Sequence, residues 1–142
     1  VMQARASVLI ECTPEAAFAF IADAANDRTW RSHLMSSHGR ATAVGDRITQ
    51  TYSAEGKTAT IELEVAEYVP PERLGYVMHK PARARFSFQC RAEGSGTRVS
   101  MAISANLSGP AALFEGRVQT EADRVLKADL AQLKRALEGA AS

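Results

Sequence analysis

The fold is decided by the stretch FEGRVQTEADRVLKADLAQLKRALEG, residues 114–139. Its apolar side chains recur at steps of three and four residues, which is the spacing of one face of an α-helix, and its charged side chains fall elsewhere on the helical wheel. The apolar members are Phe114, Val118, Ala122, Val125, Leu126, Leu130, Leu133 and Leu137. This pattern predicts one amphipathic helix that opens at Gly109-Pro110 and ends near Glu138, with a length of about 40 Å at about 1.5 Å per residue. Because such a helix cannot bury its apolar face alone, a sheet has to curl around it.

The region before this helix predicts the sheet. Residues 3–12 alternate between apolar and polar side chains, as a half-buried strand does. Beyond His38, short alternating runs are separated by turn residues such as Gly45, Gly56 and Pro70-Pro71, at the spacing of an antiparallel meander. The predicted strands cover residues 3–12, 34–43, 46–54, 57–68, 73–80, 83–93 and 97–107.

Two short helices are predicted between the first and second strands. Thr13 is a good helix N-cap, Pro14 suits the first helical position, and Glu15 suits the positive end of the helix dipole. The helices are expected over residues 14–22 and 24–33. The predicted fold class is therefore α+β, with a seven-stranded curved antiparallel sheet around a long C-terminal helix.

Composition and charge exclude several classes of protein. The 142 residues are 46% hydrophobic and 23% charged, which is typical of a globular chain and predicts a single domain over residues 1–142. A net charge of +1 provides no broad field for nucleic acid. No apolar run is long enough to span a bilayer and the N-terminus lacks the pattern of a signal peptide, so we expect a cytoplasmic protein without a membrane span. Cys12 and Cys90 are too few for a disulfide framework.

Several local stretches, in this order along the chain, resemble the START-like (SRPBCC) superfamily. This superfamily includes polyketide cyclases and dehydrases, plant pathogenesis-related ligand binders and coenzyme Q-binding proteins, and the resemblance covers about residues 3–138. It implies a helix-grip fold around an apolar ligand cavity. Because such proteins include enzymes, carriers and sensors, the fold does not decide the activity. The stretches are IECTPE (10–15), DAANDRTW (23–30), EYVPPERL (67–74), GSGTRV (94–99) and ADLAQLKRAL (128–137).

In a helix-grip domain, the inward face of the sheet and of the long helix would line the cavity. The alternation places Gln50, Tyr52 and Tyr76 on otherwise apolar inward faces. They are either ordinary core residues or polar groups that orient a ligand, since a buried amide or phenol without a partner costs about 1–3 kcal/mol. The candidate ligand-binding residues are Trp30, Gln50, Tyr52, Tyr76, Met78, Phe86, Phe88, Met101, Phe114 and Val118.

No catalytic motif is recognisable. The chain has neither a G-x-S-x-G sequence nor a glycine-rich phosphate loop. His33, Tyr52, Tyr76 and His79 are candidates for proton transfer in a cavity. His33 and His38 are five residues apart, which does not place them together on a helix face, so no metal is predicted. No cofactor is predicted either.

Three functions remain open from the sequence. The first is binding of a small hydrophobic or aromatic molecule of the lipid, polyketide or isoprenoid class. The resemblance implies a second, a polyketide aromatase or cyclase that uses cavity tyrosine and histidine side chains as acid and base. The third is a module that docks on another protein. We expect a monomer or homodimer that takes a small hydrophobic ligand and no nucleic acid.

Overall fold

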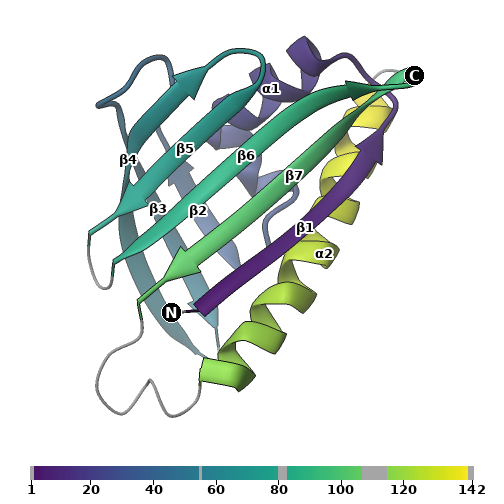
Figure 1. The fold of residues 1–142 in the computed structure, drawn as a ribbon. Helices are drawn as coiled ribbons and strands as arrows, with labels where there is room; N and C mark the ends of the chain where they lie inside the picture. The colour runs from purple at the N-terminus through teal and green to yellow at the C-terminus, as the bar shows by residue number, and fades with distance from the viewer. Residues whose placement is uncertain (1, 55, 80–82, 107–114, 141–142) are drawn as a thin grey trace.

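A computed structural model describes residues 2–54, 56–79, 83–106 and 115–140, with the side chains of 54, 115–119 and 140 left outside the description (Figure 1). Within these ranges the chain forms seven strands, two α-helices and one 3-10 helix, η1. In chain order the elements are β1 (Met2–Ile10), α1 (Pro14–Ala22), η1 (Ala24–Thr29), β2 (Leu34–His38), β3 (Arg47–Ala54), β4 (Lys57–Val69), β5 (Arg73–Met78), β6 (Ala84–Glu93), β7 (Gly96–Ala105) and α2 (Glu115–Ala140).

The strands form one antiparallel sheet in the order β1-β7-β6-β5-β4-β3-β2. Strands β2 to β7 follow one another as hairpins, and β1 closes the far edge beside β7. Figure 1 shows the sheet curling, with α2 running beside β1 and with α1 behind the sheet. This arrangement confirms the predicted α+β fold class, including the two short helices between the first two strands.

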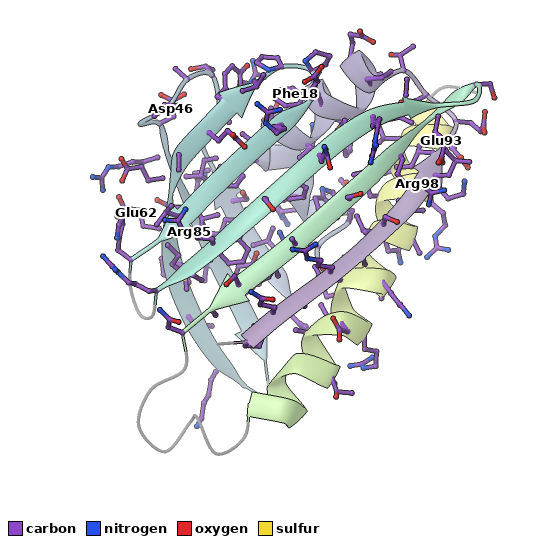
Figure 2. The ribbon with its side chains drawn as sticks, in the orientation of Figure 1. Phe18, Asp46, Glu62, Arg85, Glu93 and Arg98 are labelled. Carbon is purple, nitrogen blue, oxygen red and sulfur yellow. The ribbon has the colours of Figure 1, made fainter. Side chains whose placement is uncertain are left out.

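The two faces of the sheet differ in chemistry, as the alternation along each strand requires. The inward face contributes buried side chains such as Val99, Leu74 and Ile48 to the core. The outward face carries charged groups. Figure 2 shows Glu93 and Arg98 together at the β6–β7 turn, where a guanidinium nitrogen lies 2.7 Å from a carboxylate oxygen. The interior is therefore where a ligand of low polarity could be enclosed.

Helix α2 buries four of the six predicted apolar side chains that the structure describes. Leu126, Leu130, Leu133 and Leu137 all belong to the core. Val125 was also expected in the core and is only half-buried. Asp129 takes a place on the buried face instead, three residues after Leu126 and four before Leu133.

Most element boundaries lie within one or two residues of the prediction, and three differences near the start of the chain bear on the fold. The first strand ends at Ile10, two residues early, and the second helical stretch ends as a 3-10 helix at Thr29. Strand β2 ends at His38, five residues before the predicted end at residue 43. The chain turns there at Gly39, whose φ of +116° is unfavourable for other residues, and a Cβ at this position would lie 2.8 Å from the carbonyl oxygen of Arg47.

The start of α1 allows a test of the predicted helix N-cap at Thr13. The Thr13 hydroxyl accepts a hydrogen bond from the Ala16 backbone N–H at 3.1 Å, so Thr13 is the N-cap. We expect Thr13→Ala to lower the free energy of unfolding by about 1 kcal/mol in urea denaturation, because one helix N–H loses its acceptor. Thr13→Ser, which keeps the hydroxyl, is the control. Equal stability of the alanine and serine variants would contradict this role for the cap.

Candidate functional site

Inside the curl of the sheet lies a small hollow, which we call the interior hollow. Its lining combines the segment around η1 with strands β3 to β6. Its volume is about 10 Å³, which is close to the space of one water molecule. Half of the ten residues predicted from the sequence to bind a ligand line it, namely Gln50, Tyr52, Tyr76, Phe86 and Phe88.

Some of the predicted binding residues lie elsewhere. Trp30 is fully buried and packs edge-on against Phe88, with ring centroids 6.0 Å apart. Met101 is a core residue, and Met78 is half-buried beside the core. Phe114 and the side chain of Val118 lie outside the described residues.

Neither histidine proposed for proton transfer lines the interior hollow. His33 is exposed and has a φ of +64°. His79 is also exposed, and its Nε2 lies 3.7 Å from a carboxylate oxygen of Glu64. The tyrosines proposed for the same role, Tyr52 and Tyr76, are the ones that reach the hollow.

A buried chain of hydrogen bonds forms the polar end of the hollow. The Tyr52 hydroxyl donates to Gln50 Oε1 at 2.9 Å. Gln50 Nε2 donates to Asp27 Oδ2 at 2.7 Å and to the Ser37 hydroxyl at 3.1 Å. These bonds use both hydrogens of the Gln50 amide, which fixes its orientation. The sequence predicted Gln50 as a polar group on an apolar wall, but it did not predict that Asp27 would take part in this chain.

Asp27 is the carboxyl group that this environment perturbs. Burial raises the pKa of its carboxyl from 3.8 to about 6. The charge of Arg31, the hydrogen bond from Gln50 and the nearby Trp30 indole N–H oppose this rise, and the charge of Asp23 adds to it. The Asp27 carboxyl therefore changes its protonation state near pH 6.

The two tyrosines of the hollow stay protonated at neutral pH. Burial raises the pKa of both Tyr52 and Tyr76 above the usual value for a phenol. The Tyr52 hydroxyl is committed to Gln50, whereas the Tyr76 hydroxyl makes no hydrogen bond to another described residue. Tyr76 is consequently available as a donor to a bound molecule.

A buried ion pair joins this region to α2. Arg31 Nε lies 3.3 Å from Asp129 Oδ2, and the side chains are 12% and 2% exposed. The Ser32 backbone N–H donates to Asp129 Oδ1 at 3.0 Å, and the Ser32 hydroxyl donates to the same oxygen. The Arg31 guanidinium also lies over the Trp30 ring, 5.3 Å from its centroid. The ion pair therefore holds the segment that carries Asp27 and Trp30 against the helix.

The sequence pattern did not single out Asp27, Arg31 or Asp129. Two features of the sequence could have indicated these residues. Asp27 and Arg31 are four residues apart in a short helical stretch, and Asp129 is the one carboxylate on the buried face of α2 within the described part of that helix. A charged residue within an apolar face indicates a buried partner, because an unpaired buried charge is costly.

Residues 2–138 match the profile of the family described as polyketide cyclase / dehydrase and lipid transport. The chain belongs to this family. This membership and the helix-grip fold confirm the resemblance noted in the sequence. None of the curated proteins matches the chain.

Solved structures with the same fold as this polyketide cyclase/dehydrase family member share little sequence with it. Protein TTHA0849 from Thermus thermophilus is 21% identical over 99% of each chain, with a TM-score of 0.84. DR_A0006 from Deinococcus radiodurans is 19% identical over 97% of this chain and 98% of its own, with a TM-score of 0.73. The di-domain ARO/CYC BexL from the BE-7585A biosynthetic pathway is 20% identical over 96% of this chain and 50% of its own, with a TM-score of 0.74.

Two negative findings concern the residues that the structure describes. Among them, His, Cys, Asp and Glu side chains form no group of three or more that could hold a metal ion. No helix in the described ranges is both long and apolar enough to cross a membrane.

Proposed function

We propose that this family member binds a small hydrophobic or aromatic molecule, of the lipid, polyketide or isoprenoid class, in an expanded interior hollow. The observation that carries the proposal is the chain Asp27–Gln50–Tyr52 at one end of a hollow with largely apolar walls. Ligand sites in proteins combine apolar walls with a few oriented polar groups in this manner. A core built for stability alone would not need a buried carboxyl with a raised pKa.

The hollow has to enlarge before it can hold such a molecule, because ligand pockets have volumes of about 300–1,000 Å³. The side chains of Tyr52, Ile61 and Phe86 line the hollow and are only half-buried, whereas Gln50 and Phe88 are buried. Displacing half-buried side chains sacrifices less packing than displacing buried ones. We therefore expect the hollow to open on the side of Tyr52, Ile61 and Phe86.

The tyrosine hydroxyls provide the test of this proposal, with 2-naphthol as the probe. We expect Tyr76→Phe to weaken 2-naphthol binding about 2- to 10-fold without changing the thermal midpoint, because its hydroxyl has no described protein partner to lose. Tyr52→Phe should lower both the affinity and the thermal midpoint, because its hydroxyl holds Gln50. Calorimetric titration and thermal unfolding measure the two quantities.

Tyr68→Phe is the matched control. Tyr68 is half-buried and packs against Phe18 at a centroid distance of 5.6 Å, away from the interior hollow. It should leave the affinity for 2-naphthol unchanged. Unchanged affinity in the Tyr52 and Tyr76 variants as well would remove both residues from the site. Native mass spectrometry of protein purified from its source, followed by extraction, would identify the natural ligand.

A second candidate function is cyclisation of a polyketide-like chain. It is favoured by the Asp27 carboxyl, whose pKa of about 6 suits a general acid or base, in the same hollow as Tyr52 and Tyr76. Cyclisation needs only a proton donor or acceptor near a substrate carbonyl. Mass spectrometry of a poly-β-keto thioester incubated with the protein would reveal a cyclised product. Turnover that is lost in Asp27→Asn would favour this candidate over simple binding.

A further inference from the structure

Two buried polar atoms have no hydrogen-bond partner within hydrogen-bond geometry among the described residues, one on Asp27, which lines the interior hollow, and one on Trp30, which packs against the lining residue Phe88. They are Asp27 Oδ1 and Trp30 Nε1. Asp27 is 8% exposed and Trp30 is 2% exposed, so bulk water does not reach either atom freely. Leaving such a group unsatisfied costs about 1–3 kcal/mol, and native proteins rarely keep one without a functional reason.

The two atoms are neighbours that do not fully satisfy each other. The Trp30 indole N–H lowers the pKa of the Asp27 carboxyl as a weak hydrogen-bond donor does, but the contact falls outside full hydrogen-bond geometry, so it leaves both atoms only partly satisfied. Both side chains are also engaged elsewhere. Asp27 Oδ2 accepts the 2.7 Å hydrogen bond from Gln50, and the Trp30 ring contacts Phe88 and the Arg31 guanidinium.

A hydroxyl oxygen, on a ligand or on a water molecule that the ligand replaces, matches both atoms. A carboxylate oxygen only accepts hydrogen bonds and an indole N–H only donates them. A hydroxyl group can donate its hydrogen to Asp27 and accept from Trp30 with its oxygen. An ether or ketone could accept from Trp30 and would leave Asp27 Oδ1 unsatisfied, while a hydrocarbon would satisfy neither atom. The hollow lined by Asp27 has room for about one oxygen of this size.

We propose that Asp27 Oδ1 and Trp30 Nε1 together bind a hydroxyl group of the ligand, which is therefore a phenol, an enol or an alcohol. This inference rests on the proposed function, that the interior hollow opens to take a small aromatic or apolar molecule. The rings of Phe88 and Phe86 then contact the apolar part of the ligand. Selectivity arises because a ligand that lacks the hydroxyl leaves a buried charged oxygen without a partner.

Three probes of nearly equal shape test the proposal at pH 7.5, where Asp27 is mainly ionised. They are 2-naphthol, 2-methoxynaphthalene and naphthalene, titrated by NMR. The unaltered protein should bind 2-naphthol at least about tenfold more tightly than it binds 2-methoxynaphthalene, because only the hydroxyl group can donate a hydrogen bond to Asp27. The chain has one tryptophan, so its indole N–H signal is unambiguous. That signal should move downfield with both oxygenated probes and not with naphthalene.

Substitutions at Asp27 and at Trp30 test the two contacts to the ligand hydroxyl separately. In Asp27→Asn the amide oxygen is expected to face Gln50 Nε2, which places an NH₂ group where Oδ1 stood, so the preference for 2-naphthol over its methyl ether should fall to about twofold or less. Trp30→Phe should weaken the binding of both oxygenated probes relative to the binding of naphthalene. Tyr68→Phe is the matched control, because Tyr68 packs against Phe18 away from the interior hollow and leaves both unsatisfied atoms in place. It should keep the tenfold preference.

The outcomes distinguish this proposal from the function on which it rests. If the unaltered protein binds all three probes equally, or if a folded Asp27→Asn variant keeps the tenfold preference, the hydroxyl site is overturned and the proposed function stands. If none of the three probes binds to the unaltered protein, the proposed function fails for aromatic ligands of this size, and the hydroxyl site fails with it. If Asp27→Asn does not fold, the hydroxyl site is still tested by two results. These are the preference of the unaltered protein for 2-naphthol and the affinities of Trp30→Phe for the two oxygenated probes.

Discussion

Asp129→Ala should lower the free energy of unfolding by about 3–5 kcal/mol, because it leaves a buried guanidinium without its carboxylate. Asp129 is 1% exposed, and the Arg31 side chain paired with it is 12% exposed. The substitution also removes the acceptor for the Ser32 backbone N–H and hydroxyl. Urea denaturation monitored by circular dichroism measures the loss.

Three further variants identify the cause of that loss. Asp129→Asn keeps an acceptor for Ser32 without the charge and should be less damaging than alanine. The double variant Arg31→Met with Asp129→Leu removes both charges and should recover part of the stability, since apolar replacements of buried pairs are often tolerated. Glu121→Ala, on the exposed face of the same helix, should leave the unfolding midpoint unchanged. A small effect for Asp129→Ala, equal to that of Glu121→Ala, would show that the ion pair does not hold the segment around Arg31 against α2.

The second large effect is a dependence of stability on pH that is due to Asp27. Its pKa is about 6 in the folded protein and near 3.8 when the chain is unfolded, so between these values the folded state holds a proton that the unfolded state has released. Stability therefore falls as pH rises from about 4 to about 6, and the cost is complete above pH 6. A shift of about two pKa units corresponds to about 3 kcal/mol.

Comparison with Asp27→Asn isolates this contribution. The free energy of unfolding of the unaltered protein, minus that of the variant, should decrease by about 2 kcal/mol between pH 4 and pH 7, with the remainder of the effect below pH 4. Other ionisable groups near Asp27 are present in both proteins, so most of their contribution cancels in the difference. They are Asp23, Arg31, Tyr52, Tyr76 and Asp129. A difference that does not vary with pH would mean that burial does not raise the pKa of Asp27.

The sequence by itself determined the fold and part of the lining of the interior hollow, because both depend on local periodic patterns. A step of three or four residues aligns Leu126, Leu130 and Leu133 on one face of α2 whatever surrounds that helix. The period of two along a strand likewise places Gln50 and Tyr52 on the same side of β3. Turn residues separated most of the strands, with the break near Pro81 as the exception, so the number and order of the strands could also be predicted.

Only the tertiary structure decided which polar groups meet and how much space they enclose. Asp27 and Gln50 are 23 residues apart and Arg31 and Asp129 are 98 apart, and no local pattern relates positions at such distances. The pKa of Asp27 depends on burial by several elements at once, which its own segment does not encode. The volume of the hollow, about 10 Å³, depends on how side chains from four strands and two helices pack together, and that packing exists only in the folded chain.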